Sequence, residues 1–453
     1  MTQKHEHWSS KLGFILATAG SAVGLGALWR FPYIAGTNGG GAFVFLYLLF
    51  TFLLGFPLFI AELIIGRKTQ KSAVLAYSML SNNSENWRGL GWLNFLTSLI
   101  ILSFYSVVAG WVLSYIFMSI GNFSLGKSPQ QIQQVFDLLY TSPWINLFWF
   151  GLFLLINLAI VSSGIKKGIE HWSKILMPLL FIFLIGLFIF CMTLPGFIPA
   201  FKFVFVPNFS KLGPEGVLNA LAMALFTLSV GYGIIVTYGS YMHKSENIPK
   251  NGFYVAITTV VASLISALVI FPIVFTYNLP PEGGPGLVFK TLPVLFAKMP
   301  ATILISTVFF FLMLFASLTS TISLLEILVA NVMQVFDIER KKACYYLTAL
   351  TFVIGIPSAF AGSGKLFPNW TAIYGKNFFD MMDYITISWF TPISALLTTI
   401  FVGWLLKKEM LYDEFSSGTN LRFLAGPWYF IVKYVAPIVI AFIILHESGL
   451  VSL

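Results

Sequence analysis

The sequence predicts an all-α polytopic membrane protein, and three observations carry this fold class. Only 43 of the 453 residues are charged, which is 9% of the chain, whereas soluble domains average about 25%. Hydrophobic residues make up 58%, including 47 Phe. These residues form continuous runs long enough for helices that cross a bilayer, which needs about 20 apolar residues. So few charges exclude a water-soluble enzyme, a nucleic-acid-binding protein and a disordered scaffold.

Eleven apolar runs each predict one membrane-spanning helix, with no soluble domain between them. A β-barrel is excluded because its strands alternate apolar and polar residues. The first run is too long for a signal peptide, and no cleavage site follows it. Of the longer connections, Pro195–Gly216 and Asn278–Pro300, we expect a short surface helix in the second. The expected spans are Leu12–Ala35, Ala42–Gly66, Trp92–Ile120, Trp144–Ser163, Lys174–Leu194, Val217–Tyr241, Gly252–Tyr277, Ala301–Phe336, Ala343–Ala361, Met382–Leu406 and Gly426–Leu445.

Basic residues are distributed unequally between the two sets of connections. If the N-terminus is cytoplasmic, 17 of the 26 Lys and Arg residues lie on the inside, and eight lie outside. Cytoplasmic loops of membrane proteins carry an excess of these residues. The sequence therefore predicts a multi-pass protein of the cell membrane with a cytoplasmic N-terminus and an external C-terminus.

Two spans are interrupted by small residues, over Ala19–Gly26 in the first and Ser229–Gly233 in the sixth. Such stretches either allow helices to pack closely or let the backbone leave the helix, which is tolerable only where it lines a cavity. Interruptions at matching positions of two repeats are typical of transporters with a site at mid-membrane. We expect one transporter domain, with five-helix repeats over 12–194 and 217–406 and an extra helix over 426–445.

The first span carries a long and unusual motif. Gly20–Gly26 is followed by Trp29-Arg30-Phe31-Pro32-Tyr33 and by Asn38-Gly39-Gly40-Gly41-Ala42-Phe43. This stretch, with Phe226–Ser229 and Ala316–Ser320, closely resembles the neurotransmitter:sodium symporter family, in particular its bacterial eleven-helix amino-acid transporters. The resemblance covers about the whole chain. It implies an inverted repeat with broken helices 1 and 6, and sodium-coupled amino-acid transport by alternating access.

The resemblance also implies a binding site for a zwitterionic amino acid. Free backbone N–H groups around Leu25 and Gly26 suit the carboxylate, and the Tyr105 hydroxyl would donate a second bond. Carbonyl groups near Ala22, Phe226 and Ser229 would receive the ammonium group. The mostly apolar wall favours a hydrophobic or aromatic side chain. The implied lining of the side-chain pocket is Ile101, Phe226, Ser229, Tyr232, Ser320 and Leu324.

Two sodium sites are implied by the resemblance, and only one has a complete set of ligands. Sodium, a hard cation, suits carbonyl and hydroxyl oxygens. From the residues alone, the two hydroxyls of this set could instead bond to carbonyls of their own helix. The complete second site consists of the carbonyls of Gly20, Val23 and Ala316 and the hydroxyls of Thr319 and Ser320.

The first sodium site departs from the family pattern. It would use Ala22, Thr227 and Thr258, but Ala27 and Thr258 stand where the family has asparagines. Met223 and Ala262 stand where an amide and a carboxylate would hold or replace chloride. A buried anion is costly without a compensating cation. We expect coupling through the second sodium site alone, without chloride.

Gate residues are implied on both sides of the substrate. On the outer side, Arg30 would pair with Asp383 above an aromatic lid of Phe226 and Tyr105. An ionisable residue at membrane depth is a functional candidate. Glu62, which is also deep, is expected to bond to the unwound backbone of helix 1.

On the inner side, Trp8 and Tyr241 match the family, while His5 and Gln334 replace its usual charged pair. Histidine titrates near neutral pH, so His5 could add pH dependence, although a solvated terminal histidine is the simpler interpretation. Gly168 and Pro178 match a motif for unwinding of helix 5.

The function predicted from these features is sodium-coupled import of a hydrophobic or aromatic amino acid. The alternatives are a proton-driven or sodium-independent carrier on the same fold, and a sensor that binds the amino acid without moving it. An enzyme is not expected, because the spans contain no cluster of His, Asp or Glu. The expected partners are the amino acid, sodium and the lipid bilayer, with no nucleic acid. The sequence leaves the oligomeric state open.

Overall fold

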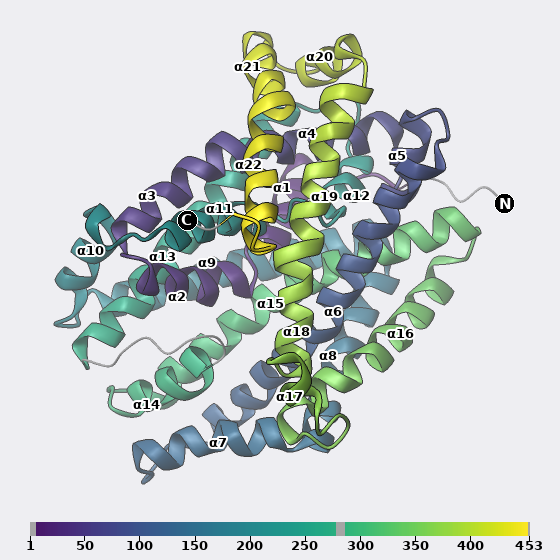
Figure 1. Cartoon of the computed structure of the whole chain (residues 1–453). Coiled ribbons are helices and arrows are strands. Elements are labelled where there is room, and N and C mark those ends of the chain that lie inside the picture. Colours follow the sequence, from purple (N-terminus) through teal and green to yellow (C-terminus); the bar gives the residue numbers. More distant parts are fainter. Residues whose placement is uncertain (1–5, 278–285, 452–453) are drawn as a thin grey trace.

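The computed structural model describes residues 6–277 and 286–451, and within these ranges it contains helices and no strands (Figure 1). Nine of the described helices are long and apolar enough to cross a membrane. A tenth span is a pair of helices bent by 54°, Lys11–Ala22 and Gly26–Thr37. The nine are Gly41–Thr69, Glu85–Ile120, Pro143–Ser162, Ile165–Cys191, Ile248–Thr276, Thr302–Phe336, Arg340–Ser363, Trp370–Leu405 and Arg422–Glu447.

The sixth predicted span is a second broken helix. It consists of α11 (Pro214–Thr227) and α12 (Ile234–Ser240), and each is too short to cross a membrane alone. Length and composition of the described helices therefore give nine or ten spans rather than the eleven expected. The breaks in helices 1 and 6 lie where the small residues predict them.

The spans are built from the following segments. The first half of the chain has α1 (Lys11–Ala22), η1 (Gly26–Arg30), α2 (Phe31–Thr37), α3 (Gly41–Phe50), η2 (Thr51–Gly55), α4 (Phe56–Thr69), α6 (Glu85–Ile120), α8 (Pro143–Ser162), η3 (Ile165–Glu170) and α9 (His171–Cys191). The second half, besides α11 and α12, has α13 (Ile248–Thr276), α15 (Thr302–Phe336), α16 (Arg340–Phe360), α18 (Phe378–Tyr384), η7 (Ile385–Phe390), α19 (Thr391–Ile400), η8 (Phe401–Leu405), α21 (Ala425–Phe430), η10 (Ile431–Val435) and α22 (Ala436–Glu447).

Wide π-helical turns interrupt several helices, and a following proline explains five of these turns. Proline lacks an N–H, and its ring collides with the carbonyl four residues earlier, so the turn before it widens. In each of the five, the proline stands two residues after the last residue of the π-helical turn. These prolines are Pro32, Pro57, Pro293, Pro392 and Pro437, after η1, η2, η5 (Leu287–Thr291), η7 and η10.

Short helices that the sequence analysis did not predict lie in the connections. One correction concerns the second long connection, where a surface helix was expected. α14 (Leu292–Ala297) is instead buried from Leu292 to Phe296, because its apolar residues pack into the core. The other short helices are α5 (Ala73–Leu80), α7 (Pro129–Thr141), α10 (Phe197–Phe205), α17 (Trp370–Tyr374) and α20 (Lys408–Ser416).

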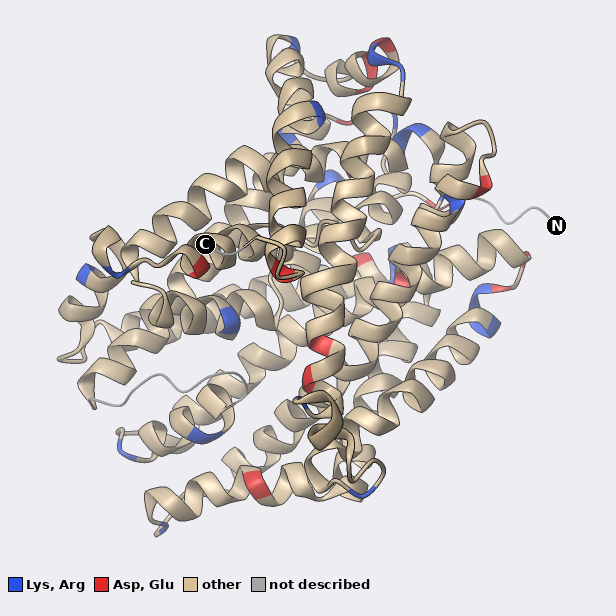
Figure 2. Ribbon diagram, in the orientation of Figure 1, with Lys and Arg blue, Asp and Glu red and all other residues tan. Residues whose placement is uncertain are grey.

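The two broken helices lie against α6 and α15, whose residues line one cavity together with both breaks. In Figure 1, α7, α14 and α17 gather at the lower edge, whereas α5 and α20 lie at the upper edge. Figure 2 shows that Lys, Arg, Asp and Glu lie mainly near helix ends and in connections, with few along the helices. A charge-poor middle is what a bilayer requires of the surface it covers.

Candidate functional site

The break in helix 1 leaves backbone groups without partners in their own helix, next to α6, the third span. α1 ends at Ala22, and the next helical turn starts at Gly26. The Leu25 N–H, which lies in the break, donates to the Tyr105 hydroxyl at 2.8 Å. Because the Tyr105 oxygen accepts this bond, its own O–H proton is left to be donated elsewhere.

The break in helix 6 contains three residues with left-handed backbone: Ser229 (φ +55°), Gly231 (+88°) and Gly233 (+72°). A left-handed serine is strained. It is held by its hydroxyl, which donates to the Ser21 carbonyl at 3.2 Å. The backbone of the two broken helices is therefore joined at mid-span.

Glu62 supports the same break from α4. Its side chain is fully buried, and Oε1 accepts the Gly231 N–H at 2.7 Å. The expectation that Glu62 bonds to helix 1 is thus wrong, since its backbone partner lies in helix 6. The sequence showed that this carboxylate needs a partner, but only the packing of α4 against α12 selects which one.

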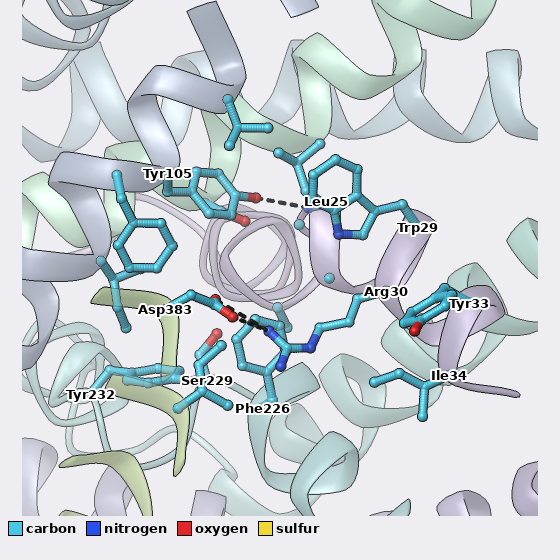
Figure 3. Close-up of a pocket in the computed structure, with 18 of the residues that line it drawn as sticks. Leu25, Trp29, Arg30, Tyr33, Ile34, Tyr105, Phe226, Ser229, Tyr232 and Asp383 are labelled. Carbon is cyan, nitrogen blue, oxygen red and sulfur yellow. Dashed lines mark hydrogen bonds and ion pairs between the residues drawn. The ribbon is translucent and has the colours of Figure 1, made fainter. Parts of the chain in front are cut away.

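A cavity of about 420 Å³ lies between the two breaks, α6 and α15 (Figure 3). All ten residues expected at a substrate site line this cavity. Sequence reasoning missed other lining residues, including Phe104 and Val108, although they lie three and seven residues after Ile101 on one face of α6. The ten are Ala22, Leu25, Gly26, Ile101, Tyr105, Phe226, Ser229, Tyr232, Ser320 and Leu324.

Arg30 and Asp383, which both line the cavity, face each other as an ion pair (Figure 3). The Arg30 Nη1 lies 3.3 Å from Asp383 Oδ1, and the side chains are 29% and 33% exposed. The guanidinium group also lies 5.4 Å from the centre of the Phe226 ring. The ion pair and the aromatic ring together cover the cavity on this side.

The hydroxyls expected at the second sodium site face the end of α1. Ser320 donates to the carbonyls of Gly20 (3.3 Å) and Ser21 (3.1 Å), across the interface between α15 and α1. Thr319 donates to carbonyls of its own helix, Phe315 (3.0 Å) and Ala316 (3.1 Å). Both hydroxyl oxygens keep lone pairs for a cation, so this donor set fits sodium chemically.

Two hydroxyls expected at the first sodium site bond to their own helices. Thr227 donates to the Met223 carbonyl at 2.9 Å. Thr258 lies on the partly exposed face of α13 and donates to its own helix at Tyr254 (2.6 Å), so its assignment to this site is corrected. The next residue, Thr259, is fully buried and donates to the Val255 carbonyl of the same helix at 3.0 Å.

The shift by one residue from Thr258 to Thr259 is repeated one helical turn later, from Ala262 to Ser263. Ser263, not Ala262, contacts the buried Tyr47 hydroxyl, at 3.4 Å, and that hydroxyl lies 3.2 Å from Thr227 Oγ1. Three hydroxyls thus meet near the position where the family resemblance implies chloride or a carboxylate. The run from Thr258 to Ala262 is apolar or β-branched throughout, so the sequence alone does not show which face is buried.

The comparisons with known proteins agree with this geometry. Residues 5–127 and 145–451 match the model of the sodium:neurotransmitter symporter family. The chain belongs to this family. A sodium-dependent transporter of Bacillus subtilis, YhdH, is 38% identical over 99% of both chains, and one of Haemophilus influenzae is 35% identical over 98% of both. The crystal structure of MhsT with L-phenylalanine is 39% identical, with a TM-score of 0.89 over 98% of this chain and 99% of that one.

Membership in the family establishes the protein as a sodium-dependent symporter and not an enzyme. The fold expected from the sequence is confirmed by the match to MhsT. In the part of the chain that the structure describes, no group of three His, Cys, Asp or Glu side chains could hold a metal ion.

Trp8 is anchored to the second half of helix 6. Its indole N–H donates to the Tyr238 carbonyl and its backbone N–H to the Tyr241 carbonyl, both at 3.1 Å. Gln334, expected beside them, instead accepts from Ser72 at 2.9 Å. His5 lies outside the described residues.

An ion pair that sequence reasoning missed lies next to Tyr241. The Tyr241 hydroxyl donates to Glu326 Oε1 at 2.6 Å, and Arg340 forms a short ion pair with the same carboxylate. Glu326 is fully buried in α15. A single carboxylate within an apolar run was the signal that could have identified it.

Helix 5 is continuous at Gly168 and Pro178. Gly168 lies in η3, where a Cβ atom would come 2.1 Å from the Ile160 carbonyl, and Pro178 lies within α9. Glu170 binds the start of helix 1, since it accepts from the Ser9 N–H at 2.7 Å and from Ser10 at 3.0 Å. Unwinding of helix 5 therefore stays a prediction.

Proposed function

We propose that this symporter carries a hydrophobic or aromatic amino acid into the cell together with sodium. The observation that carries the proposal is an apolar cavity with one polar end, where Tyr105 and the Leu25 amide meet. The charged lining residues are Arg30, Asp380 and Asp383, and the first and third are paired with each other. This leaves no countercharge deep in the cavity for an acidic or basic side chain.

The two ends of the amino acid have separate partners. The Tyr105 proton, free because the oxygen accepts from Leu25, would be donated to the carboxylate. Carbonyl groups at the end of α1 and in the helix 6 break would receive the ammonium group. MhsT, which is 39% identical, has been solved with L-phenylalanine, and this supports a substrate of similar chemistry.

Coupling is proposed to run through the second sodium site alone. Its residues, which link α1 to α15, are Gly20, Val23, Ala316, Thr319 and Ser320. A cation bound there would hold the end of α1 against α15, so sodium binding would favour the closed inner side. The first site lacks side-chain ligands at Ala27 and at Thr258, and Thr259 offers one hydroxyl at most.

We propose that transport does not require chloride, because of the kinds of side chain that surround Thr227. The hydroxyl cluster of Tyr47, Thr227 and Ser263 contains no cationic side chain, and Ser263 and Thr227 already donate to carbonyls of their own helices. An anion there would be uncompensated unless a cation bound beside it. If uptake required chloride, these three hydroxyls would be the group to which it binds.

The experiment is uptake of radiolabelled amino acids into proteoliposomes of defined ionic composition. We expect uptake of phenylalanine or leucine to exceed that of lysine or glutamate. The initial rate should rise in proportion to sodium concentration well below saturation, and replacing chloride by gluconate should leave it unchanged. A rate that rises with the square of sodium concentration would contradict coupling through one site.

A sensor that binds without transport gives a different result in the same vesicles. Vesicles loaded with unlabelled substrate would then show no counterflow, although sodium-dependent binding to the purified protein persisted. Counterflow that requires sodium supports transport and distinguishes this symporter from a carrier driven by protons.

A further inference from the structure

A groove of about 660 Å³ lies outside the substrate cavity, where α4, α13 and the start of the last span meet. Its wall is aromatic and aliphatic, and much of it is exposed: Phe253 is 46%, Tyr254 39% and Leu424 40% exposed. Trp428, which is buried, forms a fixed part of the wall because its indole N–H donates to the Pro57 carbonyl at 2.9 Å.

One end of the groove is polar and lies at the start of α13. Asn247, Lys250, Thr419 and Asn420 line it, and the Asn247 amide donates to the Gly418 carbonyl at 2.9 Å. The opposite end reaches Ile431, which lies seven residues into the last span from Leu424. At 1.5 Å per residue, this is about 10 Å of helix, a distance that runs into the hydrocarbon layer.

Two lysines at the polar end have no carboxylate partner among the described residues. Lys250 is exposed one helical turn before Tyr254. Lys11, the first residue of α1, places its Nζ 5.4 Å from the centre of the Tyr254 ring. Lys250 thus lines the groove, and Lys11, which does not line it, lies against the Tyr254 ring that does.

The carboxylates on the neighbouring segments are engaged by other groups. Glu170, which accepts from Ser9 and Ser10 next to Lys11, also pairs with Lys174 at 2.6 Å. Glu246 accepts from the Asn251 amide at 3.0 Å, and Glu414 pairs with Arg67 at 2.9 Å and with Lys68 at 3.4 Å. Positive charge at the polar end is consequently left uncompensated, directly above an apolar channel. A phospholipid with an anionic headgroup has the complementary pattern, a phosphate next to acyl chains.

We propose that this groove binds an anionic phospholipid from the leaflet on the N-terminal side of the protein. Lys11 and Lys250 bind the headgroup phosphate, and one acyl chain lies along Phe56, Phe253 and Ile431. Because Lys11 begins α1 and Lys250 lies in α13, the bound lipid also connects these two helices. The site differs from the substrate cavity and does not depend on the identity of the substrate.

The test compares lipid binding by native mass spectrometry of the full-length protein in a neutral detergent. The probes are dioleoyl phosphatidylglycerol and dioleoyl phosphatidylcholine, which share acyl chains and differ in charge. We expect phosphatidylglycerol to bind more tightly. The variant K11Q/K250Q should lose about 25-fold in affinity for it, since each lysine near an anionic surface contributes about fivefold.

Two further variants locate the site. K341Q/K342Q removes two exposed lysines at the start of α16 and should leave the affinity unchanged, as the matched control. I431W fills the apolar end of the groove and should weaken binding although both lysines remain, with thermal unfolding used to confirm that the variant is folded. Glycerol 1-phosphate should not displace the lipid, because it has the phosphate without the chains.

Equal binding of the two lipids, or equal losses in K11Q/K250Q and in the control, would overturn the proposal. Displacement by glycerol 1-phosphate would also overturn it, since the ligand would then be a free phosphate. Sodium-dependent substrate binding by K11Q/K250Q, measured separately, distinguishes failure of this site from failure of the transport function.

Discussion

At the scale of single residues, the Tyr105 hydroxyl connects the chain's own backbone to the cavity. Its oxygen accepts the Leu25 N–H at 2.8 Å and the side chain lines the cavity, so a ligand there can receive the Tyr105 proton. A carboxylate is the group with most to gain from that proton, because bonds to charged acceptors are stronger than bonds to neutral ones. The same atom thus bonds to the break in helix 1 and belongs to a donor that suits an acid group.

Replacing Tyr105 by Phe removes this donor and leaves the ring. A hydrogen bond to a charged group contributes about 1.5–3 kcal/mol, so Tyr105→Phe should weaken substrate binding by roughly 10- to 150-fold. Scintillation-proximity binding of labelled phenylalanine to the purified protein measures the change. Unchanged affinity would show that the carboxylate binds elsewhere.

Substitutions at Thr319 and Thr258 provide a test and a control for the second sodium site. Thr319 packs against Gly20 near the end of α1, whereas Thr258 lies on the partly exposed side of α13. Thr319→Val removes an oxygen ligand and should raise the half-saturating sodium concentration at least several-fold. Thr258→Val should leave it unchanged. Sodium titration of binding measures both, and the reverse pattern would reinstate Thr258 as a ligand.

At the scale of the elements, the spans were predictable because a run of about 20 apolar residues forms few structures other than a membrane-spanning helix. The breaks were predictable because several glycines stand at matching places. Their partners were not, as Glu62 shows: only folding decides that it binds Gly231. The shift from Thr258 to Thr259 has the same cause, since a helix apolar on every side does not reveal its buried face.

The left-handed turn of helix 6 requires glycine at position 231. A Cβ atom there would meet the Thr391 carbonyl at 2.9 Å, in a backbone conformation that side chains rarely adopt. Gly231→Ala should therefore lower the melting temperature and impair substrate binding. Gly186→Ala is the control, because no atom lies within 4 Å of a Cβ built there. Equal behaviour of the two variants would show that the turn tolerates a side chain.

The Glu326–Arg340 pair ties α15 to α16 and is buried on the carboxylate side. Removing one partner of a buried pair leaves an uncompensated charge and costs about 3–5 kcal/mol. Glu326→Gln and Arg340→Gln should each destabilise the protein strongly, and E326Q/R340Q should be more stable than either. Thermal unfolding of the three variants measures this, and additive losses would argue against direct coupling.

At the scale of the whole molecule, the positions of the basic residues predict which face is cytoplasmic. Both native cysteines, Cys191 and Cys344, are buried. Labelling by a maleimide therefore measures the accessibility of a cysteine introduced at the surface. Lys341→Cys, at the start of α16, should react with a membrane-impermeant maleimide only in broken cells. Gln130→Cys, in α7, should react in intact cells. The opposite pattern would invert the proposed topology.

The two closures of the molecule are unequal in strength. The outer one rests on an ion pair about one-third exposed, a class worth about 0–1 kcal/mol. The inner one rests on a fully buried Trp8 with two backbone bonds and three aromatic neighbours. We therefore expect the side of the Arg30–Asp383 pair to open at a lower cost in free energy than the side that Trp8 anchors.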